Sequence, residues 1–303
     1  MNRQLLLAKL VSRGKAAHQD CVKLSATRYI PVDEWVQLQR HEKQFLRCWA
    51  VGAATYTSVL VGRAAAVVQG MWVVPTEFKI ELANPKGTVP RKAQCPDGVG
   101  FRRMTVPEMD IRTIGANSEV KLTTKIRTAV DIARWHGVRE GVVAMDSLFV
   151  GQPWMLKDQI RDELEKTITR LGGKRGIENA RTAFALSSIL SESPFESLVR
   201  LLLRQQGLQV EEQMRIGRYR VDLLWGQLII EIDGNIKYDE DPKRSAMAQL
   251  QRESDLNEMG YRVIRIKPSQ LLASPSNVLE RIYAAKRQSE RLGPVTTEAV
   301  PAW

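Results

Sequence analysis

Apolar and polar positions alternate most regularly over residues 219–238, YRVDLLWGQLIIEIDGNIKY, and this pattern predicts a β-hairpin. Two apolar-rich runs, Tyr219–Trp225 and Leu228–Asp233, flank the dipeptide Gly226-Gln227. A glycine at the first of two turn positions fits a tight type II′ connection. The turn therefore fixes which residues of the two strands face each other.

The predicted register contains three facing pairs: Trp225 with Leu228, Leu223 with Ile230, and Asp222 with Glu231. Because side chains alternate across a strand, one face of the hairpin is uniformly apolar and suited to a core. That face consists of Tyr219, Val221, Leu223, Trp225, Leu228, Ile230 and Ile232. The other face carries most of the charge and consists of Arg220, Asp222, Leu224, Ile229, Glu231 and Asp233.

Asp222 and Glu231 should repel each other, because facing Cβ atoms lie only ~5 Å apart. A divalent cation would resolve the conflict, since Mg²⁺ takes carboxylate oxygens and keeps several waters. Lys237 follows Asp233 by four residues and adds a cation. These parts predict a metal-dependent phosphodiesterase site with Mg²⁺ (or Mn²⁺) as cofactor. Unrelated strand carboxylates, an Asp-Gly turn at Asp233 and a solvated Lys237 are the structural alternatives.

Helices and strands alternate around the hairpin. Ser193, Pro194 and Glu196 predict a helix start with a capping box, which by itself explains the glutamate. Three further elements follow the hairpin: a helix over Ser245–Met259, a strand over Tyr261–Lys267 and a helix over Pro275–Arg291. This order predicts an α/β domain with a mixed sheet flanked by helices.

The N-terminal half is predicted to be mostly helical, with a small winged-helix-like α+β unit. A helix from about Asp33 carries cations along its outer surface, and residues 57–70 predict a closely packed helix. Two strands, 72–85 and 99–106, flank a basic loop with three cations: Lys86, Arg91 and Lys92. This loop is a candidate wing that contacts phosphates, and a solvated hairpin tip explains it at least as well.

The Gly-rich basic run GGKRG at 172–176 predicts a domain boundary. It lacks the strand context and the final Lys-Ser/Thr of a phosphate-binding loop, so it predicts no nucleotide site. We expect a basic, DNA-binding domain at 1–172, a second domain at 177–291 and a disordered tail at 292–303.

The charge is uneven along the chain of 303 residues, whose net charge is +11. Residues 1–150 hold 22 Lys and Arg against 13 Asp and Glu, whereas residues 151–303 hold 23 against 21. A basic N-terminal half indicates a polyanionic partner, most often nucleic acid, and a basic protein without a specific partner is the alternative. Three widely spaced cysteines and the absence of a long apolar run predict a cytoplasmic protein without a membrane association.

Residues 193–283 resemble the very-short-patch-repair-like branch of the PD-(D/E)XK nucleases. The segments that carry the resemblance are SPFES at 193–197, RVDLLW at 220–225, EIDGNIKY at 231–238 and QRESDLNEMGYRVIRI at 251–266. The resemblance implies that Asp222 and Glu231 bind the metal, that Glu196 supports the site and that Arg252 lies beside it. Asp233 stands where the superfamily has Lys, and Lys237 is the candidate to supply that charge from a shifted position.

Residues 1–150 look like the N-terminal part of AbiEi-type antitoxins, the transcriptional autoregulators of an abortive-infection system. The segments that carry this resemblance are RYIPVDEW at 28–35, the helix around 58–70 and TTKIRTAVDIA at 123–133. It implies a winged-helix DNA reader and a cognate toxin as a possible partner. The whole chain therefore predicts a DNA-binding protein with a metal-dependent endonuclease-like domain. The alternative is a non-enzymatic antitoxin-like autoregulator in phage defence, with an inactive nuclease fold.

Overall fold

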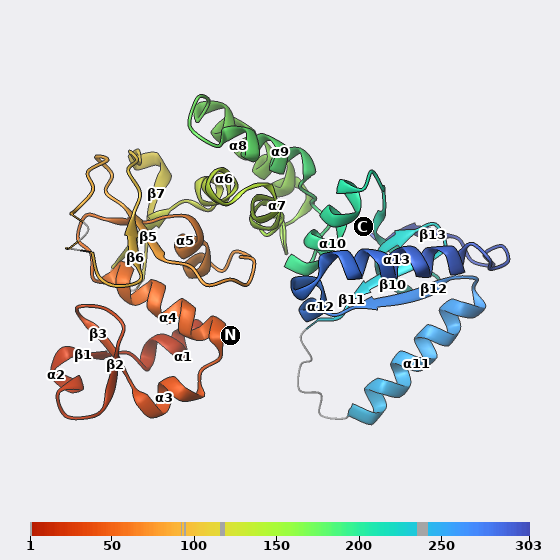
Figure 1. Cartoon of the computed structure of the whole chain (residues 1–303), viewed down its shortest axis with the longest axis horizontal. Helices are drawn as coiled ribbons and strands as arrows, with labels where there is room; N and C mark the ends of the chain where they lie inside the picture. The colour runs from red at the N-terminus through yellow and green to blue at the C-terminus, as the bar shows by residue number, and fades with distance from the viewer. Residues whose placement is uncertain (1, 92, 94, 116–118, 235–241) are drawn as a thin grey trace. The chain divides into compact units, whose positions relative to one another are not determined.

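A computed structural model describes every residue except 1, 92, 94, 116–118 and 235–241. Two of the predicted site residues, Lys92 and Lys237, therefore lie outside the described residues. The chain divides into two compact units (Figure 1). The first comprises residues 1–148 and 152–185, and the second comprises residues 149–151 and 186–303. The division falls at residue 185 and not at the Gly-rich run 172–176.

A small α+β layer opens the first unit. Its three strands are ordered β1-β3-β2 and pair antiparallel. The elements are α1 (Arg3–Ala8), β1 (Val11–Ser12), α2 (Arg13–Ala16), β2 (Cys21–Lys23), β3 (Arg28–Pro31) and α3 (Val32–Gln37). The following helix α4 (Arg40–Ala53) buries Phe45, Leu46 and Trp49 in a core that also contains Ile30 of β3 and Leu122.

A five-stranded sheet, ordered β6-β5-β4-β8-β7, packs on the same core. Its elements are β4 (Val59–Leu60), α5 (Gly62–Gln69), β5 (Ile80–Ala83), β6 (Val99–Phe101), the 3₁₀ turn η2 (Glu108–Asp110), β7 (Ile111–Ile114) and β8 (Val120–Thr123). Strands β5 and β6 run parallel, so the basic loop between them is a crossover and not the predicted hairpin tip. The small residues Ala64–Ala66 of α5 are fully buried, as close packing requires.

Four helices complete the first unit: α6 (Lys125–His136), α7 (Val138–Asp146), α8 (Trp154–Arg170) and α9 (Ile177–Leu186). The Thr124 hydroxyl caps α6 by accepting from the Arg127 amide at 3.3 Å. Arg127 also pairs with Asp131 at 2.8 Å and with Asp110, and these three side chains are buried. This network is structural, because its charges are matched inside the unit.

The second unit contains a mixed five-stranded sheet in the order β12-β11-β10-β9-β13. Its elements are α10 (Pro194–Gln205), β9 (Glu211–Ile216), β10 (Tyr219–Trp225), β11 (Leu228–Ile232), α11 (Pro242–Glu258), β12 (Arg262–Ile266), α12 (Pro268–Ala273), α13 (Pro275–Ser289) and β13 (Ala299–Pro301). Strands β11 and β12 are parallel and the other neighbours are antiparallel. The predicted mixed α/β architecture is confirmed.

The central hairpin has the predicted turn. Gly226 has φ +59°, and the facing pairs Trp225–Leu228 and Leu223–Ile230 are present. Its two faces are less distinct than predicted, since Leu224 and Ile229 are buried with Leu256 and Tyr261. The acidic residues of the hairpin strands are Asp222 in the middle of β10 and Glu231 near the end of β11.

The C-terminal segment was expected to be disordered, and that expectation is wrong for its last residues. Strand β13 pairs antiparallel with β9, which would otherwise be an open sheet edge. The hydroxyl of Tyr261 donates to the Thr297 carbonyl oxygen at 2.9 Å, and Val295 packs on the core of the second unit. The described part of the chain contains no helix with the length and apolarity that a membrane crossing requires.

Deletion of residues 294–303 is expected to lower the free energy of unfolding of the second unit by about 2 kcal/mol. The deletion removes the Tyr261 hydrogen bond and the packing of Val295. Scanning calorimetry of the full chain measures the change. Val300→Thr alters only a partly exposed side chain of β13 and is the control. An unchanged transition after the deletion would show that β13 contributes nothing to stability.

Candidate functional site

Glu196, Asp222 and Glu231 belong to the second unit, and the charge of Asp222 acts on both glutamates. Burial is the largest cause that raises the pKa of Glu196 and of Glu231, and the charge of Asp222 raises the pKa of both further. Glu196 is at the start of α10, where the Ser193 hydroxyl accepts from the Glu196 amide at 3.1 Å. Asp222 and Glu231 come from the adjacent strands β10 and β11. The roles expected of them, Asp222 and Glu231 as metal ligands and Glu196 as a supporting acid, stay predictions.

The regular pairing of β10 with β11 stops before Asp222. The ladder to β11 ends at Leu223–Ile230, and the predicted facing pair Asp222–Glu231 is not formed. Instead, Oδ2 of Asp222 accepts a hydrogen bond from the Ile232 amide at 2.9 Å. A side-chain carboxylate thus takes the place of a strand carbonyl as the acceptor for the Ile232 amide.

A second distortion lies on the other side of Asp222. The β9–β10 register skips the position of Gln213 opposite Asp222, and Gln213 has φ +52°. A left-handed conformation is strained for a residue with a side chain and marks a local constraint. The side-chain amide of Gln213 donates to Oε2 of Glu196 at 3.0 Å, and the backbone amide of Glu192 donates to the same oxygen at 2.9 Å. The strained backbone therefore places a donor on Glu196.

Two arginines neutralise Glu231. Arg252 of α11 pairs with Oε1, and the Arg265 guanidinium lies 2.9 Å from Oε2. Arg265 also pairs with Asp233 at 3.1 Å. The Nε atoms of both arginines are buried, and neither has a hydrogen-bond partner among the described residues. Each arginine therefore holds Glu231 and keeps one further donor.

Arg252 lies beside Glu231, and the supporting role that the resemblance implies for it stays a prediction. Its guanidinium reaches Glu231 and donates to the Arg220 carbonyl oxygen at 2.5 Å. Arg265 was missed by the sequence analysis. It lies beside Glu231 because β12 runs parallel to β11 with Glu231 and Arg265 as register partners. To predict this contact from the sequence, one would need to know which strand β12 pairs with and in which direction. The β-branched residues of β12 indicate a strand but specify neither its neighbour nor its direction.

Burial shifts the pKa of all three carboxyl groups upward. Desolvation is the largest cause in each case, and it raises the pKa of Glu196 to about 7. The Glu192 amide opposes this shift at Glu196, and the Ile232 amide opposes it at Asp222. At Glu231 the opposing groups are the two arginines. The site thus concentrates acids that resist ionisation, a pattern found at functional sites.

The structure describes two of the three predicted cations of the basic loop, Lys86 and Arg91. Lys86 forms an isolated antiparallel bridge with Thr105, and the Lys86 and Arg91 side chains are exposed. These two residues stay candidates for nucleic-acid contact on charge alone.

A restriction-endonuclease-like family model, REase_MTES_1575, matches residues 195–285. The C-terminal domain is restriction-endonuclease-like. The match includes Glu196, Asp222, Glu231, Arg252 and Arg265, and it spans about a third of the chain. A search of curated proteins finds no match to the chain.

Within the described residues, no group of three or more His, Cys, Asp or Glu side chains is arranged to hold a metal ion. The restriction-endonuclease-like domain instead offers two strand carboxylates, Asp222 and Glu231. Asp222 forms no ion pair within 4.0 Å of a described residue. Mg²⁺ fits such a set, because it commonly takes one or two carboxylates and completes its octahedron with water.

Glu196→Gln is expected to change how stability depends on pH. The folded-state pKa of Glu196 is about 7 against an ordinary 4.5, so the folded chain holds this proton more tightly. Stability therefore falls as the pH rises from about 4.5 to about 7, by up to ~3 kcal/mol. Glutamine stays neutral, and the stability difference between variant and wild type should grow by this amount between pH 4 and pH 8. Urea denaturation in EDTA measures it, and parallel pH curves would contradict the shift.

Proposed function

We propose that the restriction-endonuclease-like domain hydrolyses phosphodiester bonds of DNA with Mg²⁺ or Mn²⁺. The observation that carries this proposal is the grouping of Glu196, Asp222 and Glu231, with two arginines, inside the segment that the family model matches. Buried acids beside cations with spare donors are the components that binding and cleaving a phosphodiester require.

Each side chain has a role that its contacts favour. Asp222 and Glu231 would hold the metal, which when bound would polarise the phosphate and lower the pKa of a water. Glu196 would keep a proton or a hydrogen bond close to the water, since its pKa of about 7 lies near neutral pH. Arg252 and Arg265 would donate to the phosphate through the exposed parts of their guanidinium groups, since their side chains are 32% and 26% exposed. Lys237 keeps the cationic role that the very-short-patch-repair resemblance assigns to it.

Asp233 receives a different role from the one expected of a catalytic residue. Its carboxylate pairs with Arg265, 3.1 Å away, and so fixes the guanidinium that also binds Glu231. The position that holds Lys in the superfamily would here orient a cation supplied by the neighbouring strand. We assign Asp233 a positioning role on this contact.

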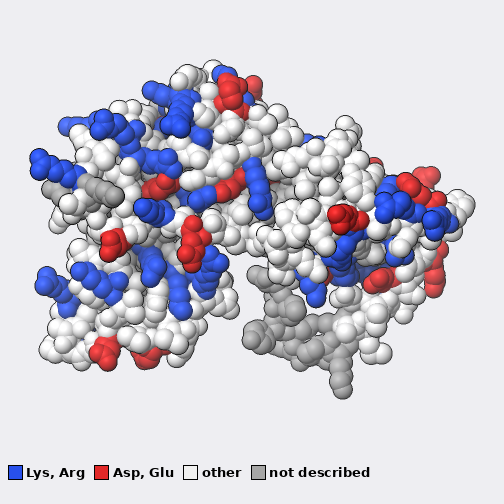
Figure 2. Space-filling model, in the orientation of Figure 1, with Lys and Arg blue, Asp and Glu red and all other residues white. Residues whose placement is uncertain are grey.

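The first unit would supply DNA affinity. It carries most of the net positive charge, and Lys and Arg side chains are spread over its visible face (Figure 2). The AbiEi-like resemblance adds a winged-helix reader and a toxin partner to this proposal.

One observation favours a non-enzymatic alternative. Glu231 is already matched by Arg252 and Arg265, so the site balances much of its charge without a metal. In that case the nuclease fold would be an inactive part of an antitoxin-like autoregulator. The two functions differ in whether a divalent cation competes with the arginines for Glu231.

Asp222→Asn is expected to abolish Mg²⁺-dependent cleavage of plasmid DNA and the stabilisation of the domain by Mg²⁺. The substitution removes one ligand charge and keeps the side-chain size. Glu280→Gln is the matched control, since Glu280 is an exposed acid on α13. Gel assays of cleavage and melting curves across a Mg²⁺ titration measure both effects. Cleavage by the Asn variant at the wild-type rate would refute the site, and a wild-type chain that neither cleaves nor responds to Mg²⁺ or Mn²⁺ would favour the autoregulator.

Arg265→Ala is expected to separate metal binding from cleavage. Without Arg265, one cation fewer competes with Mg²⁺ for the Glu231 carboxylate, so Mg²⁺ should bind more tightly. Loss of a charge-assisted hydrogen bond to the phosphate should slow cleavage by about 10- to 100-fold at saturating Mg²⁺. Calorimetric titration and single-turnover cleavage measure the two quantities. Weaker Mg²⁺ binding in this variant would instead make Arg265 a purely structural partner of Glu231.

A further inference from the structure

A large open cleft in the first unit is not explained by the nuclease-like site. Its volume is about 1340 Å³, and it lies between α4, the β2–β3 turn region and the edge of the five-stranded sheet at β5 and β6. Pockets for single small molecules usually enclose about 300–1,000 Å³. The volume therefore suits part of a chain-like ligand better than one small molecule.

One side of this α4 cleft is a row of cations. Arg40, Lys43 and Arg47 are three and four residues apart, which places them on one face of α4, and all three line the cleft. Lys23 of β2 adds a fourth cation to the lining. Like charges at this spacing repel and destabilise a helix, so the row is unfavourable without an anion nearby.

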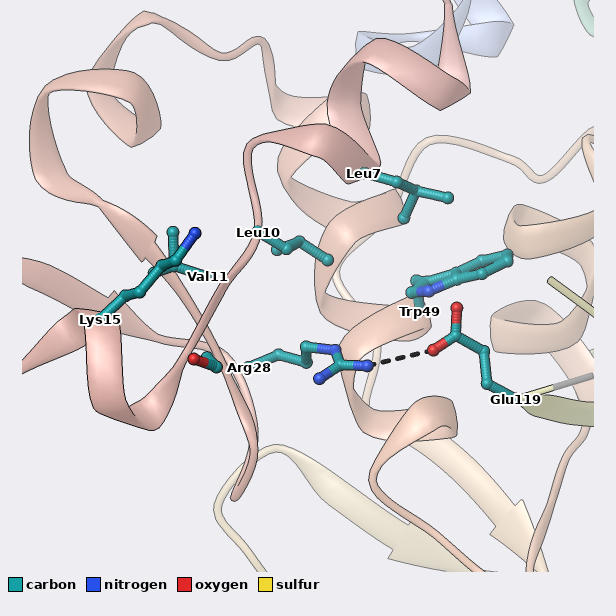
Figure 3. Close-up of a pocket in the computed structure, with 8 residues that line it drawn as sticks. Leu7, Leu10, Val11, Lys15, Arg28, Trp49 and Glu119 are labelled. Carbon is teal, nitrogen blue, oxygen red and sulfur yellow. Dashed lines mark hydrogen bonds and ion pairs between the residues drawn. The ribbon is translucent and has the colours of Figure 1, made fainter. Parts of the chain in front are cut away.

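Within the described part of the chain, no carboxylate lies within ion-pair distance of these four cations. Lys43 and Arg47 instead lie against the Trp35 ring, 5.5 and 5.4 Å from its centroid. A smaller pocket of the same unit differs in this respect, because its cation Arg28 pairs with Glu119 at 3.1 Å (Figure 3). Two acids, Glu77 and Asp97, do line the α4 cleft but pair with none of the cations.

Apolar and aromatic side chains also line the α4 cleft. Phe78 and Phe101 are partly buried there against the core residues Ile80, Leu82 and Val99. The Arg63 guanidinium lies 5.9 Å from the centroid of the Phe78 ring and adds a further cation beside it. A ligand that fits must present repeated negative charge to α4 and flat apolar surface to the phenylalanines. Single-stranded nucleic acid has both, because its unpaired bases expose faces that stack on aromatic rings. In a duplex the base faces are stacked inside the helix and cannot stack on Phe78 and Phe101.

We propose that the α4 cleft binds a single strand of nucleic acid, with its phosphates along Arg40, Lys43 and Arg47 and its bases against Phe78 and Phe101. Arg40 and Arg47 are about 10 Å apart along the helix axis, which matches two to three successive phosphates. This site is independent of the cleavage chemistry, since it needs neither a metal nor the second unit's carboxylates.

The test is equilibrium binding of a fluorescein-labelled oligothymidylate of about 12 nucleotides, followed by anisotropy across a salt series in EDTA. EDTA prevents hydrolysis, so failure of the nuclease proposal leaves this result unaffected. The triple variant Arg40→Ala/Lys43→Ala/Arg47→Ala should lower affinity about 100-fold at 0.1 M salt and make the log–log salt slope shallower by about 2. Phe101→Ala should lower affinity about 5- to 150-fold and leave the salt slope unchanged.

The control is Arg112→Ala/Lys125→Ala/Arg139→Ala, which removes three exposed cations of the same unit that do not line the cleft. A second variant, Arg40→Lys/Arg47→Lys, keeps the charges and should keep the salt slope. Circular dichroism melting shows whether each variant is folded. Equal losses in the cleft and control triples, equal competition by the matching duplex, or equal competition by polyglutamate would each overturn the proposal in favour of general polyanion binding.

Discussion

The second unit buries the carboxyl groups of Glu196 and Glu231 and half-buries that of Asp222, and the packing of the neighbouring elements depends on them. Glu196 and Glu231 are each only 7% exposed, and Asp222 is half-buried. The charge of Asp222 acts on both glutamates. A buried carboxylate is costly unless hydrogen bonds or cations compensate it. The surrounding elements are arranged so that each acid receives such compensation from a different part of the chain.

The compensation differs from one acid to the next. Glu196 receives neutral donors from Gln213 and Glu192, Asp222 receives the Ile232 amide, and Glu231 receives two guanidinium groups. Strand β12 must run parallel beside β11 to deliver one guanidinium, and α11 must pack back to deliver the other. The need to compensate Glu231 is thus consistent with both the place of β12 in the sheet and the presence of arginines beside the carboxyl groups.

Much of this domain was predictable from the sequence, because local signals coincide there with tertiary structure. The Gly226-Gln227 turn specified the hairpin register, and Ser193 specified the start of α10. The distortions at Asp222 and Gln213 were not predictable, since an ideal ladder is the simplest extension of an alternating pattern. The contribution of Arg265 depends on a contact between strands that are far apart in sequence, and strand periodicity does not encode a partner.

In the first unit the same limits had larger effects. Residues 72–106 were predicted to contain two strands joined by a basic hairpin loop, whereas β5 and β6 pair parallel and the loop crosses over. Strand direction is set by the sheet that receives the strands, so turn-like composition alone is misleading there. By contrast, the sequence predicted cations along the outer surface of a helix from about Asp33. The structure divides this segment into α3 and α4, and a cleft lies in front of the α4 cations.

The hydrogen bond from the Ile232 amide to Asp222 has a spectroscopic consequence. The Asp222 carboxylate accepts from this amide at 2.9 Å, and hydrogen bonding of this kind slows exchange of an amide proton with solvent. Any event that turns Asp222 toward another partner would release the amide and shift its nitrogen and proton resonances. The NMR signal of the Ile232 amide thus reports whether Asp222 keeps this hydrogen bond, and it does so whether or not the domain cleaves DNA.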